Sequence, residues 1–184
     1  MFTCARFIPA LLAGAALNFA PPAADAQTPI RVGLGGGISM PVGDIAETSS
    51  SGINLVASLT YEPRRLPVGF EASAAYHNFA SAGKGNENSF VMAVTGGITI
   101  PIPSTYAKPY LMAGAGYYNT QGPTTGAVDA ERDLGGYGGV GIRFVNARSE
   151  FHMKATFHEI FADRDPSGRV RSRELIPISF GVLF

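Results

Sequence analysis

A strict alternation of large apolar residues with small or polar ones ends the chain. From Leu175 to Phe184, every even-numbered position carries a large apolar side chain, and Pro177, Ser179 and Gly181 stand between them. Successive side chains of a β-strand point to opposite faces of the sheet, so this segment has one apolar and one polar face. The pattern predicts a strand whose two faces meet different surroundings.

Seven earlier segments, each of about ten residues, repeat this alternation with varying clarity. In the second, Val56 interrupts the polar face, and in the fifth, apolar residues or glycine occupy both faces, so the orientation of that segment stays open. No helical stretch separates the segments. The sequence therefore predicts an all-β, eight-stranded antiparallel barrel. The seven segments are 30–40, 53–62, 68–77, 90–100, 110–118, 137–144 and 150–158.

The connections between these segments are expected to alternate in length. Three short ones contain the Pro, Asn and Ser typical of sharp reversals, namely 63–67, 101–105 and 146–149. The others are longer and rich in Gly, Ser, Thr, Asn and charge, namely 41–52, 78–89, 119–133 and 162–172. Transmembrane β-barrels have short periplasmic turns and longer outer loops. The alternation predicts an up-and-down transmembrane barrel with both termini on the short-turn side.

The beginning of the chain has the composition of a signal peptide. One arginine precedes an apolar run at 7–17, and small residues at 24–26 form an A-x-A pattern. The apolar run is too short to span a bilayer as a helix. We predict a signal peptide at 1–26, cleaved after Ala26, and an outer-membrane barrel domain at 27–184.

Charge and cysteine content exclude several classes of function. The 14 basic residues balance the 14 acidic ones, so no overall field would attract nucleic acid. The single cysteine, Cys4, precedes the apolar run, and cleavage would leave a mature chain without a thiol. We expect no nucleic-acid partner, no disulfide framework and no thiolate site.

Aromatic residues are expected to form two belts at the membrane–water boundaries, where amphipathic rings collect. The belt on the short-turn side is predicted to contain Tyr61, Phe70, Tyr110, Phe144, Phe151 and Phe184. The belt on the loop side is predicted to contain Tyr76, Phe79, Phe90, Tyr118, Tyr137, Phe157 and Phe161.

Four features of the chain carry a resemblance to a known group: the leader, the glycine-rich segment 33–37, the stretch 109–117 and the terminal segment 178–184. With these features the chain resembles the small outer-membrane β-barrel families, the group of the OmpA transmembrane domain and OmpX- or OmpW-like proteins. The resemblance covers nearly all of the predicted mature chain. It implies a protein of the bacterial outer membrane that contacts lipid and lipopolysaccharide and is inserted by the barrel-assembly machinery. In those families that machinery recognises the last strand, which implies a signal formed by Ile178, Phe180, Val182 and Phe184.

The inward positions of the predicted strands carry charges of both signs. Eight strands enclose an interior that side chains largely fill, and buried ions are costly unless they pair. We therefore predict a polar network with a structural role, in a barrel that has a structural or surface-interaction function. A narrow gated conduit is the alternative, with Arg143 and Lys154 facing Glu71 and Glu150. The predicted network comprises Arg31, Glu62, Glu71, Arg143, Glu150, His152, Lys154 and His158, and His77 shares its inward parity.

Catalytic and metal sites have less support. His152 and the pair His158-Glu159 invite comparison with lipid A deacylases, but no serine stands two residues beyond either histidine. Six residues of strand separate the two histidines by about 20 Å, too far to share one ion. The aspartates of segment 163–168 fit a solvated loop better than a cation site. We expect no enzyme activity, no cofactor and no metal.

Two further alternatives stay open. The long loops would face outward and could bind an extracellular ligand, although they carry few aromatic anchors. A soluble, lipocalin-like carrier would have its apolar residues inside, and the chain lacks the tryptophan usual near the first strand of such proteins. We expect a monomer.

Overall fold

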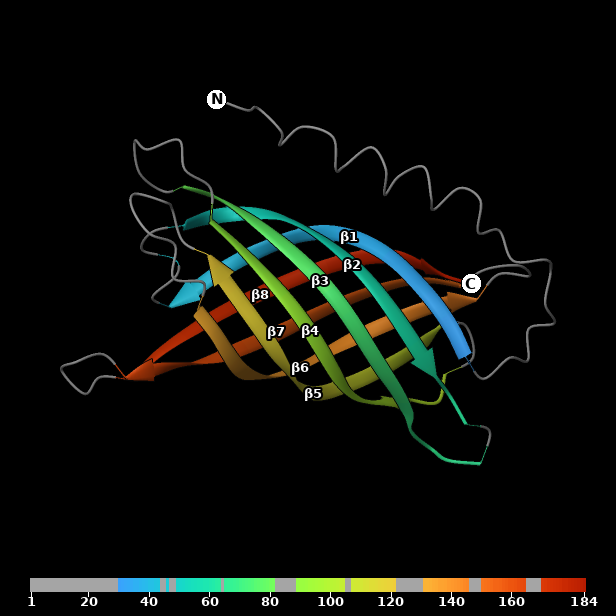
Figure 1. Ribbon diagram of the computed structural model, residues 1–184. Helices are drawn as coiled ribbons and strands as arrows, with labels where there is room; N and C mark the ends of the chain where they lie inside the picture. Colours follow the sequence, from blue (N-terminus) through green and yellow to red (C-terminus); the bar gives the residue numbers. More distant parts are fainter. Residues whose placement is uncertain are drawn as a thin grey trace, which may run out of the picture.

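The computed structural model is a closed antiparallel barrel of eight strands, each paired with its neighbours in sequence (Figure 1). This confirms the predicted all-β, up-and-down architecture. The strands are β1 (Ile30–Gly43), β2 (Ser49–Tyr61), β3 (Gly69–Ser81), β4 (Ser89–Pro101), β5 (Lys108–Gln121), β6 (Glu131–Val145), β7 (Glu150–Arg164) and β8 (Val170–Leu183).

The structure describes residues 30–43, 46, 49–63, 65–81, 89–104, 107–121, 131–145, 150–164 and 170–184. The predicted signal peptide at 1–26 lies outside the described residues, as do the central parts of the predicted loops. Nowhere in these ranges does a helix occur that is long and apolar enough to span a membrane.

Pairing between the first and last strands closes the barrel. Leu34 on β1 stands opposite Val182 on β8, and the register continues up to Gly43 opposite Arg173. Beyond β8, the backbone N–H of Phe184 donates to the carbonyl of Val32 over 2.8 Å. The C-terminus therefore lies at the same end as the β2–β3 turn (Figure 1). Closure leaves no open sheet edge, which is the condition for a sheet to lie in lipid.

The apolar face of the sheet points outward. Val94, Ile53 and Leu55 are 64%, 63% and 62% exposed, whereas their inward neighbours Thr95 and Asn54 are buried. A soluble carrier barrel has the opposite arrangement, with its apolar residues around an internal cavity. The lipocalin-like alternative is therefore wrong.

The orientation of β5, which the sequence left open, follows from its register. Tyr110, Met112 and Tyr118 are buried inside, while Leu111 and Tyr117 are 45% and 44% exposed on the outer face. Small residues complete both faces of the strand. The pairing with β4 and β6, rather than the hydrophobicity of β5 itself, decides which face enters the lumen.

Part of the predicted aromatic belts is wrong. Phe79, Tyr110, Tyr118 and Tyr137 lie inside the barrel, with exposures of 0%, 3%, 0% and 8%. Position along a strand alone suggested a belt, but the parity of these four residues turns them inward. Tyr117, which was not predicted, lies on the outer face instead. Outward rings remain at both ends, among them Phe144 and Phe151 at one end and Phe157 and Phe161 at the other.

The strands are longer than predicted on the loop side. They extend into the expected loops and leave 44–48, 82–88, 122–130 and 165–169 between them. These intervals are similar in length to the short-turn intervals 62–68, 102–107 and 146–149, so the predicted contrast in length is largely absent. A ladder of backbone hydrogen bonds needs no apolar side chains, so it continues into polar sequence that shows no alternation.

Inward glycines make room for the lumenal tyrosines. A Cβ atom added at Gly141 would overlap the ring of Tyr110, which stands opposite it on β5. A Cβ at Gly97 would lie 2.5 Å from the hydroxyl of Tyr137, and one at Gly114 would lie 2.7 Å from its Cε1. The glycine-rich strands thus allow large rings to lie flat against the inner wall.

Replacing Gly141 by alanine should destabilise the barrel because the new methyl group forces the Tyr110 ring to move. We expect a loss of about 1–3 kcal/mol, the usual cost of overpacking. The matched control is Gly96→Ala, since a Cβ at Gly96 meets nothing within 4 Å. That variant should change stability by less than about 0.5 kcal/mol. Urea unfolding in detergent micelles, followed by heat-modifiable gel mobility, would compare them; equal losses would contradict the packing described here.

Candidate functional site

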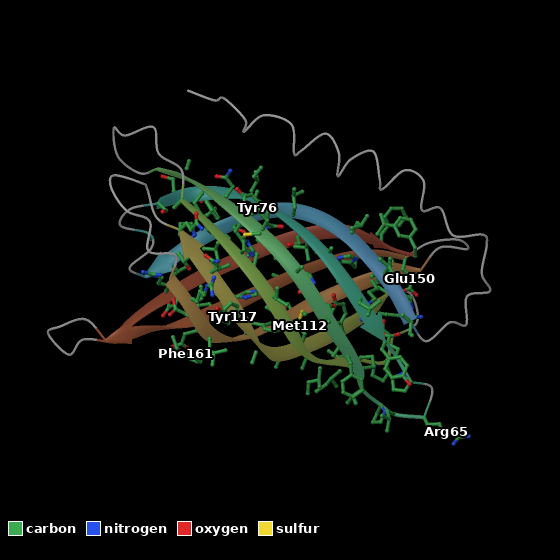
Figure 2. The ribbon with its side chains drawn as sticks, in the orientation of Figure 1. Arg65, Tyr76, Met112, Tyr117, Glu150 and Phe161 are labelled. Carbon is green, nitrogen blue, oxygen red and sulfur yellow. The ribbon has the colours of Figure 1, made fainter. Side chains whose placement is uncertain are left out.

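The lumenal side chains are arranged in levels along the barrel. Ion pairs occupy the short-turn end, a single ion pair spans the middle, and two histidines lie above it toward the loop end. An apolar plug, formed by Phe79, Val91, Ala93, Tyr118, Ile160 and Leu175, follows beyond them. Figure 2 shows Glu150 at the same end as Arg65 of the β2–β3 turn, with Phe161 toward the opposite end.

The short-turn end contains a network of charged side chains, which we call the short-turn cluster. Arg31 on β1 donates hydrogen bonds to the carboxylates of Glu62 and Glu150. Arg143 on β6 donates to Glu62 from across the lumen, and Lys108 lies 3.9 Å from Glu150. Each carboxylate thereby meets two basic side chains, which compensates for much of the cost of removing these charges from water.

The position of Arg143 shows how the cluster is built. Its guanidinium lies 4.5 Å from the centroid of the Tyr110 ring, in cation–π geometry. The conduit hypothesis placed Arg143 opposite Glu71 or Glu150, but its ion pair is with Glu62. Glu62 follows the last residue of β2, so its reach into the lumen depends on strand tilt, which alternation does not reveal.

The carboxyl group of Glu62 lies in the turn beyond β2, outside the spanning strands. Burial raises its pKa, but the hydrogen bonds and charges of Arg143 and Arg31 outweigh this effect and lower the pKa overall. The stabilisation from this group is therefore complete above the pKa of the unfolded carboxyl. It is lost as the pH falls through the lower pKa of the folded state.

A single ion pair crosses the middle of the lumen. Nζ of Lys154 on β7 lies 2.6 Å from Oε1 of Glu71 on β3, and the two side chains are only 8% and 6% exposed. The two strands are not neighbours in the sheet, so the pair bridges the barrel. Neither charge could be buried here alone at reasonable cost.

Two histidines and a set of neutral polar groups lie above this pair. His158 contacts the Tyr118 hydroxyl through Nδ1 at 2.8 Å and the Thr156 hydroxyl through Nε2 at 2.9 Å, and its ring stacks on Tyr137. His77 contacts the Ser39 hydroxyl through Nδ1 at 2.7 Å. The bond between His158 and Tyr118 joins β7 to β5, and the bond between His77 and Ser39 joins β3 to β1.

An amide continues this hydrogen-bonded layer toward β8. Asn54 donates through Nδ2 to the Ser39 hydroxyl at 3.1 Å, and its Oδ1 accepts from Ser179 at 2.9 Å. The amino-acid type of these neutral residues does not mark them as lumenal, because serine, threonine and asparagine are equally common at exposed positions. Their inward parity is the one signal that could have identified them.

The eight residues of the predicted network all have places in or at the end of the lumen, but they do not form one unit. The short-turn cluster contains Arg31, Glu62, Arg143 and Glu150. The central ion pair is formed by Glu71 and Lys154. His152 packs against the backbone at Gly181 and has no ion pair within the described strands. A function for this network stays a prediction.

The geometry of the histidines also bears on the chemistry considered from the sequence. His152 lies beside Gly181 near the short-turn end, whereas His158 bonds to Tyr118, a member of the apolar plug. Within the described ranges, no three metal-ligating side chains gather around one point. What this arrangement can do is hold paired charges and fill the lumen.

Comparisons with known proteins agree with this architecture. Residues 10–157 match the sequence model of the outer membrane protein beta-barrel domain family. No curated protein matches the sequence. Among solved structures, Neisserial surface protein A is similar with a TM-score of 0.65 and 13% identity, over 85% of this chain and 96% of that one.

Two further structures show the same fold. Ail, the attachment invasion locus protein of Yersinia pestis, aligns with a TM-score of 0.51 and 17% identity, over 86% of this chain and 100% of its own. The N-terminal barrel of Pseudomonas aeruginosa OprF aligns with a TM-score of 0.51 and 11% identity, over 85% and 98%. At these identities the likeness establishes fold alone.

The family match spans most of the chain, and the outward apolar face and closed sheet are those of a barrel in lipid. The chain therefore belongs to the family of outer membrane protein β-barrel domains, and its place is the bacterial outer membrane.

Proposed function

We propose that this protein is a non-conducting outer-membrane barrel with a structural or surface-interaction role and a lumen filled by polar side chains. One observation carries the proposal. The lumen is occupied at two separate levels, by the ion-paired short-turn cluster at one end and by the apolar plug near the other. An ion would have to displace paired charges and then pass the buried side chains of the plug, and each step opposes permeation.

The alternative is a narrow conduit gated by rearrangement of the ion pairs. The Lys154–Glu71 pair favours this hypothesis, because two charges that bridge the barrel could exchange partners with the short-turn cluster. Both hypotheses are consistent with the structure described above. They differ in what happens when one ion pair is removed.

Single-channel recording in planar bilayers separates these hypotheses. We expect the refolded barrel to be silent over a wide voltage range, and Lys154→Ala and Glu150→Ala to be silent too, since the apolar plug remains in place. Arg65→Ala, at an exposed arginine of the β2–β3 turn outside the short-turn cluster, controls for loss of a positive charge. Conductance steps in the native protein, or steps that appear only in Lys154→Ala or Glu150→Ala, would favour the gated conduit instead.

A surface role would be carried by the loop end of the barrel. The strands are connected there by the segments 44–48, 82–88, 122–130 and 165–169, which apart from residue 46 lie outside the described residues. Two similar structures bear names that describe a surface protein and an attachment protein, which supports the proposal by analogy. Under this proposal, lipid and lipopolysaccharide surround a barrel that acts without catalysis, and a ligand would bind to the loops.

We propose that residues 1–26 are removed during export. N-terminal sequencing of the protein recovered from outer membranes should begin at Gln27, because signal peptidase accepts small residues at positions 24 and 26. Replacing Ala26 by leucine should leave a longer precursor on a denaturing gel, and Ala16→Leu, within the apolar run at 7–17, serves as the control. Recovery of a chain that starts elsewhere would contradict the predicted boundary.

We also propose that Ile178, Phe180, Val182 and Phe184 form the signal for assembly. Phe184→Ala should lower the amount of barrel in the outer membrane several-fold, while spontaneous refolding into detergent should be unchanged. Phe151→Ala is the matched control, since Phe151 and Phe184 are 50% and 51% exposed on the lipid face near the same end. Equal losses in both variants, or a matching loss of refolding, would indicate a packing role instead.

A further inference from the structure

A small cavity lies in the lumen between the central ion pair and the histidines. Its volume is about 30 Å³, and its lining includes Met112, which Figure 2 labels on β5. A buried water molecule needs roughly 10–15 Å³ of cavity volume, so this cavity has room for about two water molecules. Polar residues in its wall include Glu71, His77, Thr95, Lys154, Thr156 and Ser179.

One ring nitrogen at this cavity lacks a partner. His77 is 1% exposed, and its Nδ1 is engaged by the Ser39 hydroxyl. Its Nε2 has no hydrogen bond among the described residues. Leaving a buried polar atom unpaired costs about 1–3 kcal/mol, so native proteins usually satisfy such atoms with protein groups or with ordered water.

The charges at the cavity favour a neutral occupant. Lys154 and Glu71 both line it, but they are paired with each other over 2.6 Å and contribute no net charge. The hydroxyls of Ser73 and Thr95, bonded to each other at 2.7 Å, and the hydroxyl of Thr156 offer further polar contacts. A water molecule needs two to four polar partners, and the wall can supply them.

We infer that this cavity is a water-binding site in which about two ordered water molecules satisfy His77 Nε2 and join it to the hydroxyls around the central ion pair. The site lies between the short-turn cluster and the apolar plug. It does not depend on whether the barrel conducts, so it can be tested separately from the proposed function.

Magnetisation transfer from water to alanine methyl groups tests the site directly. In the refolded, methyl-labelled barrel in deuterated detergent, the methyl of Ala75, which lines the cavity, should show a cross-peak to water. The methyl of Ala74 on the lipid face is the matched control and should show none. A visible Ala75 methyl without transfer from water would overturn the proposal.

A double-mutant cycle adds an energetic test that does not rely on that signal. Ala75→Val should displace water and leave His77 Nε2 unsatisfied, which should lower the folding equilibrium constant roughly tenfold. In a His77→Phe background the same substitution should be neutral or stabilising, because no unpaired nitrogen remains. Stabilisation by Ala75→Val in the native background would show a dry cavity. Dependence of the unfolding midpoint on chloride at constant ionic strength would show an anion site; either result would overturn the proposal.

Discussion

Backbone hydrogen bonding in lipid is the constraint on which the rest of this structure depends. A strand in the hydrocarbon layer cannot leave N–H or C=O groups unpaired, so the sheet must close on itself. Here closure is made by β1 and β8, and the backbone bonds between Val32 and Phe184 extend it past the end of the last strand. Once the sheet is closed, its outer face in the hydrocarbon layer must be largely apolar, and most polar side chains of the strands are confined to a narrow interior.

That confinement explains the contents of the lumen. Charged groups can remain there only in pairs, which accounts for the short-turn cluster and for the bridge between Lys154 and Glu71. Neutral polar groups must bond to one another, as His158 does with Tyr118. Large rings need space that a narrow barrel lacks, and glycines such as Gly141 supply it. The interior is thus a packed core with polar components.

The alternation of apolar and polar residues predicts the strands well and the contacts inside the barrel poorly. Alternation located all eight strands and identified the lipid face of β8, because burial in lipid on one side leaves a period of two. It placed Tyr110 and Tyr118 in the aromatic belts, since β5 has apolar residues or glycine on both faces. The predicted strand ends fall too early for a different reason, because the polar residues that continue the ladder of backbone hydrogen bonds resemble loop sequence.

The sequence by itself determined eight strands, most of them with one apolar and one polar face, because that outcome depends on a local repeat which nearly every strand carries independently. The closing pairing of β1 with β8 and the outward direction of the apolar face are tertiary outcomes. The tertiary structure decided which side chains meet inside. Arg143 pairs with Glu62 and Lys154 with Glu71 because strand tilt and register bring distant positions to the same level of the lumen. Such distances depend on the geometry of all eight strands together, and no local pattern in the chain encodes them.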